Sequence, residues 1–286
     1  MIQRAFITEW RSKAPWALDE QVEQDLVVSR ALVELYSEEV LRRGLAFRGG
    51  TALHKLYLEV PARYSEDIDL VQVEAGPIGP VVDAIRRRLD PWLGVPQWKR
   101  GHGRVTLNYR FMTEPEPVQQ KRLKVEINTR EHFSVLGLVV RRFDLASRWW
   151  SRQAEITTYA LDELLGTKLR ALYQRKKCRD LFDLWIAASW SDVDASKVVH
   201  CFLRYVGNDG LRVSRAEFEA NLHRKLSDPL FGRDVEPLIS LTTKWDQASA
   251  AEYVLTHLAP LLPGQPWKAN PKPPSVVGRN HEHMSS

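Results

Sequence analysis

The sequence is poor in cysteine and contains no long apolar run. Its 286 residues include two cysteines, Cys178 and Cys201, which exclude a disulfide framework and lack the spacing of a metal-binding knuckle. No apolar stretch approaches the ~18–20 residues that a membrane-spanning helix requires. The first residues also lack the apolar region of a secretory signal. We therefore expect a cytoplasmic protein, held in a reducing compartment and not associated with a membrane.

Positive charge is present but unevenly distributed. The formal net charge is +5. Residues 97–152 contain twelve Lys or Arg and five Asp or Glu, so this segment carries +7 and the remainder −2. A local excess of this size indicates either a solvated basic face or a polyanionic partner such as RNA, and charge alone leaves both readings open.

Hydrophobic periodicity changes near residue 160. Before it, helical spacing alternates with strand-like alternation; after it, the spacing is helical throughout. The expected helices are 18–43, 52–58 with Thr51 as its cap, 81–93, 161–175, 178–190, 194–206, 214–226 and 247–259, and the expected strands are 64–73, 104–111 and 122–128. We therefore predict an α/β (α+β) lobe over 1–158, a helical lobe over 159–262 and a proline-rich, disordered tail over 263–286.

The stretch 47–53 offers small residues and accessible backbone. Gly49, Gly50 and Thr51 follow an apolar run and precede a helical pattern. Backbone N–H groups at such a turn can hold phosphate oxygens. A glycine turn before a helix is common, however, so this stretch alone is weak evidence for a phosphate site.

The stretch 63–70 offers paired carboxylates. Asp67 and Asp69 alternate with apolar residues, so in a strand both carboxylates point to the same face. Their mutual repulsion needs compensation, and a divalent cation is the usual means. Glu126, the only acid in the alternating segment 122–128, is the candidate third carboxylate; a surface role beside Lys124 is the alternative.

Together these features resemble the layout of the polymerase-β-like nucleotidyltransferase fold. Nucleotidyl transfer uses two metal ions about 3.5–4 Å apart, and Mg²⁺ suits an all-oxygen site that also binds phosphates. Asp67 and Asp69 would bridge the ions, while Glu126 would help to bind the ion that activates the attacking hydroxyl. The Ser65 hydroxyl and backbone N–H groups near Gly50 would hold phosphate oxygens.

A third group of residues follows in the helical part. Helical spacing places Lys168, Leu172, Arg175 and Arg179 on one side. Arg179 is also four residues before Asp183, the spacing of an ion pair. In one straight helix Lys168 and Asp183 would be ~22 Å apart. A turn at residues 176–177 would instead bring them together. A solvated basic helix is the alternative.

These segments, taken together, resemble the AbiEii/AbiGii toxin family of nucleotidyltransferases, which includes the mycobacterial MenT toxins, over roughly residues 45–190. The resemblance implies use of an NTP and Mg²⁺, and toxicity restrained by a cognate antitoxin protein. Some members add nucleotides to the tRNA 3′ acceptor end. By position, Ser65 and Asp67 match the family's nucleotide and metal motif, Lys168 its NTP-contacting lysine and Asp183 its late essential aspartate.

We therefore expect a metal-dependent, toxin-type nucleotidyltransferase that transfers NMP from an NTP to RNA, with tRNA as the first candidate, and blocks translation. The predicted catalytic residues are Asp67, Asp69, Lys168 and Asp183, the metal ligands Asp67, Asp69 and Glu126, and the nucleotide-binding residues Arg48, Gly49, Gly50, Thr51, Ser65 and Arg179. Two alternatives stay open: transfer to a small-molecule or protein hydroxyl, and an NTP-binding regulator without catalysis. Phosphorylation of Ser65 would add ~1.5–2 negative charges and should inactivate the enzyme.

Overall fold

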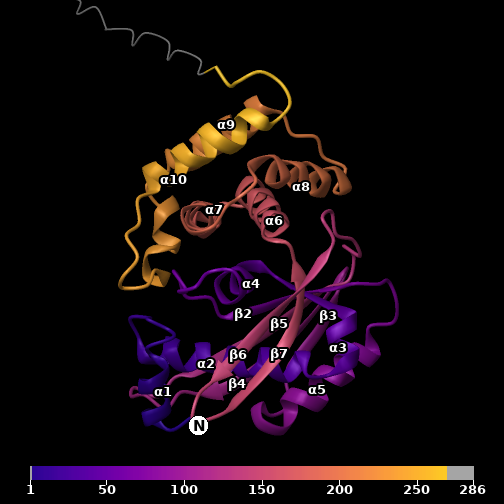
Figure 1. The fold of residues 1–286 in the computed structure, drawn as a ribbon, viewed down its shortest axis with the longest axis vertical. Helices are drawn as coiled ribbons and strands as arrows, with labels where there is room; N and C mark the ends of the chain where they lie inside the picture. The colour runs from indigo at the N-terminus through magenta and orange to yellow at the C-terminus, as the bar shows by residue number, and fades with distance from the viewer. Residues whose placement is uncertain (1, 269–286) are drawn as a thin grey trace, which may run out of the picture.

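The computed structural model describes residues 2–268, so residues 269–286 of the expected tail lie outside the described residues. A seven-stranded sheet and five helices form the first part of the chain, which we call the sheet lobe, and helices form the rest, the helical lobe (Figure 1). The predicted α/β class is confirmed. No helix within residues 2–268 is both long and apolar enough to cross a bilayer.

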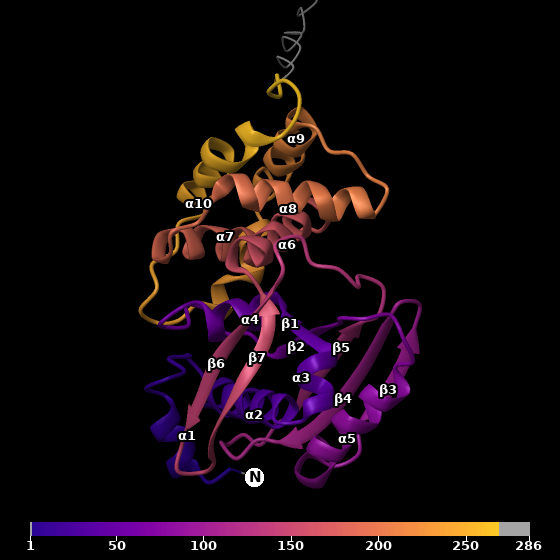
Figure 2. The same cartoon turned by 45° about the vertical axis from the view of Figure 1, so that its right-hand side comes forward.

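The sheet is mixed and has the order β3-β4-β5-β2-β1-β7-β6. Its central strands β2 and β5 are parallel, β1 is antiparallel to β2, and β1 is parallel to β7. The strands are β1 Leu45–Arg48, β2 Asp67–Gln72, β3 Gln97–Gly101, β4 Arg104–Met112, β5 Gln120–Asn128, β6 Leu138–Ala146 and β7 Ser151–Tyr159. Figure 2 shows β3 and β6 on opposite sides of the sheet.

One face of the sheet is apolar and the other is polar. Alternate residues of β2, β4 and β5 are at most 1% exposed and join the core beneath helices α2 and α5. They are Ile68, Leu70, Val105, Leu107, Tyr109, Leu123, Val125 and Ile127. The residues between them form the opposite face, which we call the polar face, and this face carries the predicted carboxylates.

The helices belong to two hydrophobic cores. The first core holds most of the sheet lobe, and the second holds the helical lobe together with Leu53, Leu58 and Ala62 from and after α4, which lies between the sheet and α6 (Figure 1). The helices are α1 Arg4–Trp10, α2 Asp19–Tyr36, α3 Glu39–Gly44, α4 Gly49–Leu56, α5 Gly79–Leu93, α6 Leu161–Gln174, α7 Cys178–Trp190, α8 Ala195–Asn208, α9 Arg215–Leu226 and α10 Gln247–Tyr253. Shorter helical turns are Phe231–Asp234, Glu236–Leu238, Val254–Leu258 and Ala259–Leu261.

Several expected boundaries are wrong. The helix expected over 18–43 is interrupted after Tyr36, where Glu38 is extended and precedes α3. Thr51 does not cap α4, because that helix already begins at Gly49 and the Thr51 hydroxyl donates to the Asp67 carbonyl instead. The strand expected over 64–73 begins only at Asp67, since Tyr64 bonds through its backbone to Leu238.

Candidate active site

The three predicted carboxylates lie side by side on the polar face. In the register of the parallel pair β2–β5, Asp69 is opposite Glu126 and Asp67 is opposite Lys124. On the other side of β2, Arg48 of β1 is opposite Asp69. Directly opposite residues share a face, so the sheet brings together Asp67, Asp69 and Glu126 as the sequence predicted.

This carboxylate group is only partly neutralised. Lys124 Nζ lies 2.8 Å from Asp67 Oδ2 and 3.7 Å from Glu126 Oε2. Asp69 has no hydrogen-bonding or ion-pairing side-chain partner among the described residues. Burial, and repulsion from Asp67, raise the pKa of Asp69. The site thus disfavours a third negative charge unless a further cation is present.

The donor set fits a hard divalent cation. All three side chains offer carboxylate oxygens, the ligand type that Mg²⁺ prefers, and the Lys124 ammonium already lies between two of them. Within residues 2–268, no group of three or more His, Cys, Asp and Glu side chains is arranged so that it could hold a metal ion by itself. Mg²⁺ is usually held by one or two carboxylates together with substrate phosphates and waters, so it does not need three protein ligands.

The glycines allow α4 to approach the carboxylates closely. Gly49 has φ +82°, and a Cβ there would lie 2.4 Å from Asp69 Oδ2. A Cβ on Gly50 would lie 2.3 Å from an Arg63 side-chain nitrogen. Any side chain at either position would therefore displace its neighbour, and only glycine adopts the Gly49 conformation without strain. The N-terminal N–H groups of α4 thereby lie beside Asp69.

Ser65 joins this turn from the preceding loop. Its hydroxyl is 2.8 Å from the Thr51 hydroxyl and would be 3.3 Å from a Cβ on Gly50. The structure therefore groups Gly50, Thr51, Ser65 and Asp67 around the start of α4. Their predicted roles toward phosphate, and the effect of Ser65 phosphorylation, stay predictions.

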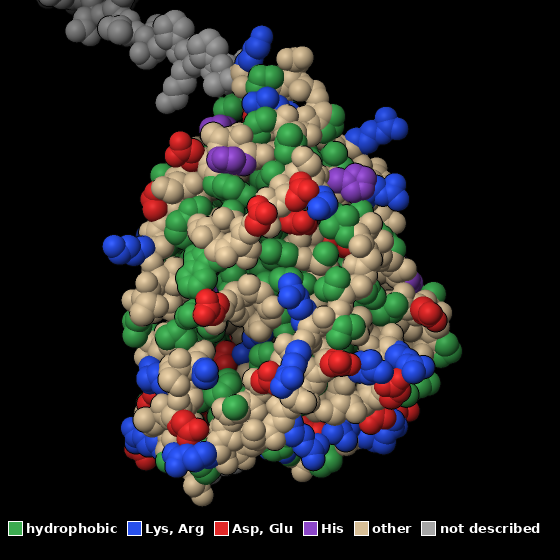
Figure 3. All heavy atoms as spheres, viewed as in Figure 1, with side chains coloured by type: hydrophobic (Ala, Val, Ile, Leu, Met, Phe, Trp, Pro, Cys, Tyr) green, Lys and Arg blue, Asp and Glu red, His purple; other side chains and the backbone are tan. Residues whose placement is uncertain are grey.

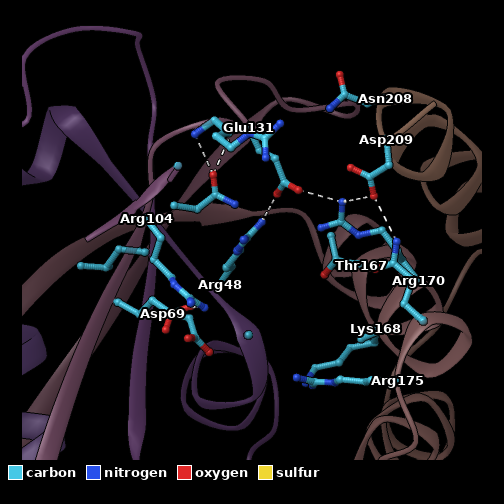
Figure 4. Close-up of a pocket in the computed structure, with 18 of the residues that line it drawn as sticks. Arg48, Asp69, Arg104, Glu131, Thr167, Lys168, Arg170, Arg175, Asn208 and Asp209 are labelled. Atoms are coloured by element: carbon cyan, nitrogen blue, oxygen red, sulfur yellow. Dashed lines mark hydrogen bonds and ion pairs between the residues drawn. The ribbon is translucent and has the colours of Figure 1, made fainter. Parts of the chain in front are cut away.

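A cavity of about 830 Å³ extends from the carboxylates to the helical lobe (Figure 4). Asp69 lies on the sheet side, while Lys168, Arg170 and Arg175 lie on the opposite side. Glu126 of β5 also lines the cavity. Six cationic side chains and four acidic ones line it: Arg48, Arg104, Arg130, Lys168, Arg170 and Arg175, with Asp69, Glu126, Glu131 and Asp209. This volume falls within the range of small-ligand pockets, and the cationic excess suits an anionic ligand.

Lys168 is held in place by a buried ion network. Its Nζ lies 2.7 Å from Asp183 Oδ2 and 3.4 Å from Asp180 Oδ1. Asp183 is fully buried and also accepts two bonds of 2.7 Å from the Arg63 guanidinium and one of 3.0 Å from His54. Burial alone would raise the pKa of Asp183, but Arg63 and Lys168 hold it well below its usual range.

The turn between α6 and α7 brings Lys168 and Asp183 together. Helix α6 ends at Gln174 and α7 begins at Cys178, so the two helices pack as neighbours rather than continuing as one. The expected Arg179–Asp183 ion pair is wrong, because the two oxygens of Asp183 are taken by Arg63, Lys168 and His54. Arg179 and Asp183 are also not among the side chains that line the cavity.

Arg175 lies beside the cavity, where helical spacing had predicted Arg179. It lines the cavity, and its guanidinium donates to both oxygens of Asp180 at 2.7 and 2.8 Å. Arg175 follows the last residue of α6 directly, so the helix end aims it at the cavity. Helical spacing had placed Lys168, Arg175 and Arg179 on one side, but the helix ends before Arg179.

A second chain of ion pairs crosses the cavity, and it was not predicted from the sequence. Glu131, in the loop after β5, pairs with Arg48 of β1, and its other oxygen is 2.7 Å from Arg170 of α6 (Figure 4). Burial would raise the pKa of Glu131, but Arg170 and Arg48 lower it to about 2. Arg170 also contacts Asp209 at 3.4 Å. The members are far apart in sequence, so no local spacing could have revealed them.

Comparison with known proteins gives the family. Residues 30–253 match the family described as nucleotidyl transferase AbiEii toxin, type IV TA system. MenT4, a nucleotidyltransferase toxin from Mycobacterium tuberculosis H37Rv, aligns with 21% identity and a TM-score of 0.63, covering 91% of this chain and 90% of that one. A protein described as a nucleotidyltransferase from H. pylori aligns with 15% identity and a TM-score of 0.50, covering 85% and 95%.

The two structural likenesses, at these identities, support the fold. No curated protein matches the sequence. The family match spans most of the chain, including the carboxylates, the α4 turn and the α6–α7 network described above. The chain therefore belongs to the AbiEii family of nucleotidyltransferase toxins of type IV toxin–antitoxin systems.

Proposed function

We propose that this protein transfers a nucleoside monophosphate from an NTP to RNA, with the 3′ acceptor end of tRNA as the first candidate, and thereby blocks translation. The observation that supports this most is the cavity, which joins Asp69 and Glu126 on one side to Lys168, Arg170 and Arg175 on the other. A triphosphate needs cations, and the transferred phosphoryl group needs metal-binding carboxylates next to them.

In this proposal the triphosphate lies between Lys168, Arg175 and the start of α4. Lys168 is fixed by Asp183, so its charge is available at a defined place rather than on a mobile side chain. Gly49 exposes backbone N–H groups next to Asp69, where phosphate oxygens would meet them. Arg175, fixed by Asp180, adds a second cation from the opposite wall.

Asp67, Asp69 and Glu126 would hold the divalent ion or ions. Bound Mg²⁺ supplies charge neutralisation at the α-phosphate and favours ionisation of the attacking hydroxyl. The hydroxyl oxygen of the acceptor forms a bond to the α-phosphorus, the bond from that phosphorus to the bridging oxygen of the β-phosphate breaks, and pyrophosphate leaves. The hydroxyl proton passes to a base or to water. Lys124 Nζ lies 2.8 Å from Asp67 Oδ2, so binding of an ion by Asp67 would require Lys124 to move aside.

The acceptor is tested by supplying each NTP, labelled at the α-phosphate, together with total RNA and Mg²⁺. We expect label on RNA, and sequencing of RNA 3′ ends should identify the extended species and the base added. Label on the protein, or on a small molecule, would replace RNA as the acceptor. NTP binding without pyrophosphate release would indicate a regulator rather than an enzyme.

Family membership implies an antitoxin partner and an NTP substrate. We propose a cognate antitoxin protein that restrains this activity, and the cytoplasm, where NTPs and tRNA are found, as the location. Growth arrest on expression of the wild-type chain, relieved by Asp69→Asn, would tie toxicity to the carboxylate site. Equal arrest by both proteins would separate toxicity from nucleotidyl transfer.

A further inference from the structure

The polar face of strands β3, β4 and β5 carries an excess of cations. Residues directly opposite one another in the register share this face, and rows of them extend from Asp67 and Asp69 across to the β3 edge. The face comprises Gln97, Lys99, Gly101, Arg104, Thr106, Asn108, Arg110, Met112, Gln120, Arg122, Lys124, Glu126 and Asn128. Five of these side chains are cationic, and Glu126 is the only acid among them.

The cations differ in what they contact. Near the carboxylates, Arg104 lies 3.5 Å from Glu126, and Lys124 lies 2.8 Å from Asp67. Farther away, Lys99, Arg110 and Arg122 are exposed and have no acidic partner within ion-pair distance in the described part of the chain. We call these three residues the free cations.

The positions of the free cations form a path toward the metal site. Along β5, alternate residues are about 7 Å apart, so Arg122 lies about 13 Å from Glu126, with Lys124 between them. Arg110 is directly opposite Arg122 on β4, and Lys99 is in the same row as Glu126 and Asp69. A chain of phosphates lying on this face would therefore end at the carboxylates.

The other basic half of the sheet offers no such surface. On the β6–β7 hairpin, Arg142 pairs with Asp144 at 3.0 Å and Arg148 pairs with Glu9. Arg141 stacks over the Tyr57 ring, and the exposed Arg152 has no acidic partner within the described residues but lies over the Trp150 ring. The +7 segment 97–152 is thus divided between opposite edges of the sheet. On the face of the sheet lobe that Figure 3 shows, cationic and acidic side chains are intermixed.

We propose that the polar face of β3–β5 binds the phosphodiester backbone of the acceptor RNA and directs its terminal hydroxyl to Asp67, Asp69 and Glu126. This inference rests on the proposed function, because it assumes that the acceptor is a polynucleotide. Within the basic segment 97–152, it assigns acceptor binding to three residues, Lys99, Arg110 and Arg122. NTP binding is assigned to different residues, Lys168 and Arg175. Binding of this kind is electrostatic and independent of base sequence.

The test compares two double variants with the same change in charge. Arg110→Glu/Arg122→Glu removes two free cations, while Arg142→Glu/Arg152→Glu alters the β6–β7 edge and serves as the control. The full-length proteins are titrated with a labelled tRNA at several salt concentrations, and separately with a fluorescent NTP. Circular dichroism checks that both variants are folded.

We expect Arg110→Glu/Arg122→Glu to weaken RNA binding at least tenfold near 0.1 M salt and to reduce the slope of log affinity against log salt by about 1.4, the value for two phosphate contacts on a single strand. Binding of the NTP should change less than twofold. The control should bind RNA within twofold of the wild type.

Three outcomes would overturn the proposal. Unchanged RNA binding by Arg110→Glu/Arg122→Glu, with wild-type transfer of label to RNA, would remove this surface and leave the proposed function standing. Equal weakening by the control would indicate general charge attraction rather than this face. If the wild-type protein transfers label to protein and binds no RNA, the proposed function and this inference are both overturned. This outcome is seen with the wild-type protein and needs no variant.

Discussion

Two groups of acidic residues lie within reach of the same cavity, yet their surroundings are opposite. Asp67, Asp69 and Glu126 are half-buried on the polar face of the sheet, with Lys124 between Asp67 and Glu126, and burial together with Asp67 raises the pKa of Asp69. Asp180 and Asp183 are fully buried on α7. Burial disfavours their charged forms, but surrounding cations lower the pKa of each.

This difference indicates different roles for the two groups: the sheet carboxylates for the reaction, and the α7 carboxylates for the positioning of other side chains. Among the sheet carboxylates, Asp67 and Glu126 have Lys124 and Arg104 as neighbours, whereas Asp69 has no ion-pair partner among the described residues, so the group retains capacity for a metal ion and its substrate. The α7 carboxylates already have Arg63, Lys168 and Arg175 as partners, and their oxygens are occupied. We therefore regard Asp183 as a positioning residue that fixes Lys168, whereas Asp69 would contact the metal directly.

The largest expected effect is the loss of transfer activity in Asp69→Asn. The substitution keeps the shape of the side chain but removes a charge that the metal needs, so we expect kcat/KM to fall at least ~10³-fold, roughly 4 kcal/mol of transition-state stabilisation. The free energy of unfolding should not decrease, because Asp69 is repelled by Asp67 and has no partner to lose. Labelled NTP transfer and urea unfolding measure the two quantities. Activity near the wild-type level would remove Asp69 from the metal site.

The next effect is a loss of stability in Asp183→Asn. Removing one partner of a buried ion network leaves the others uncompensated, so we expect unfolding free energy to fall by about 3 kcal/mol. In protein that remains folded, KM for the NTP should rise more than kcat falls, because Lys168 loses its anchor. Urea unfolding and steady-state kinetics test this.

Asp183→Asn also distinguishes the two roles of Asp183. A large fall in kcat with unchanged stability would make Asp183 a catalytic residue, as the family resemblance implied. The sheet carboxylates and the α7 carboxylates would then differ in burial but not in role.

Much of the fold was predictable because it depends on local periodicity. Helix α7 matches its expected range, and β4 and β5 were recognised from their alternation. The edge strands were missed for physical reasons. All residues of β3 are exposed, and β6 also lies at an edge, so neither strand shows the one-sided apolar pattern that burial imposes. Strand β1 has only four residues.

The site was predictable only where its residues are close in sequence or on one strand face. Asp67 and Asp69 are two residues apart, and Glu126 needed only the assumption of a neighbouring strand. Arg48, Glu131 and Arg170 meet from three distant segments, so only the folded chain could reveal their ion pairs. The ion pair expected between Arg179 and Asp183 is absent although both lie on α7, because residues distant in sequence, Arg63 and His54, together with Lys168, face the Asp183 oxygens.

His54, which is hydrogen-bonded to Asp183 of the α7 pair, should make the free energy of unfolding depend on pH. Burial lowers the pKa of this histidine to about 4, below its usual 6.5, although its hydrogen bond to Asp183 acts in the opposite direction. The unfolded chain therefore binds a proton that the folded chain refuses, so this contribution to stability is present above pH 6.5 and is lost as pH falls toward 4. Between pH 7 and pH 5 we expect a loss of about 2 kcal/mol.

Urea unfolding of the wild type and His54→Gln at pH 7 and pH 5 measures that loss. Glutamine keeps a donor for Asp183 but cannot titrate. Between pH 7 and pH 5 the variant should therefore lose about 2 kcal/mol less unfolding free energy than the wild type. Parallel curves for the two proteins would mean that His54 does not carry the dependence.

The smallest effect compares two arginines that the sequence could not separate. Arg175 lines the cavity and is held by Asp180, whereas Arg179 is absent from the cavity lining and has no ion-pair partner within residues 2–268. We expect Arg175→Ala to raise KM for the NTP about tenfold, equivalent to about 1.4 kcal/mol, because the phosphates lose one fixed cation. Arg179→Ala, the matched control, should change KM less than twofold. A larger rise in KM for Arg179→Ala than for Arg175→Ala would support the original prediction that Arg179 binds the nucleotide. It would also mean that the end of α6 does not decide which arginine reaches the triphosphate.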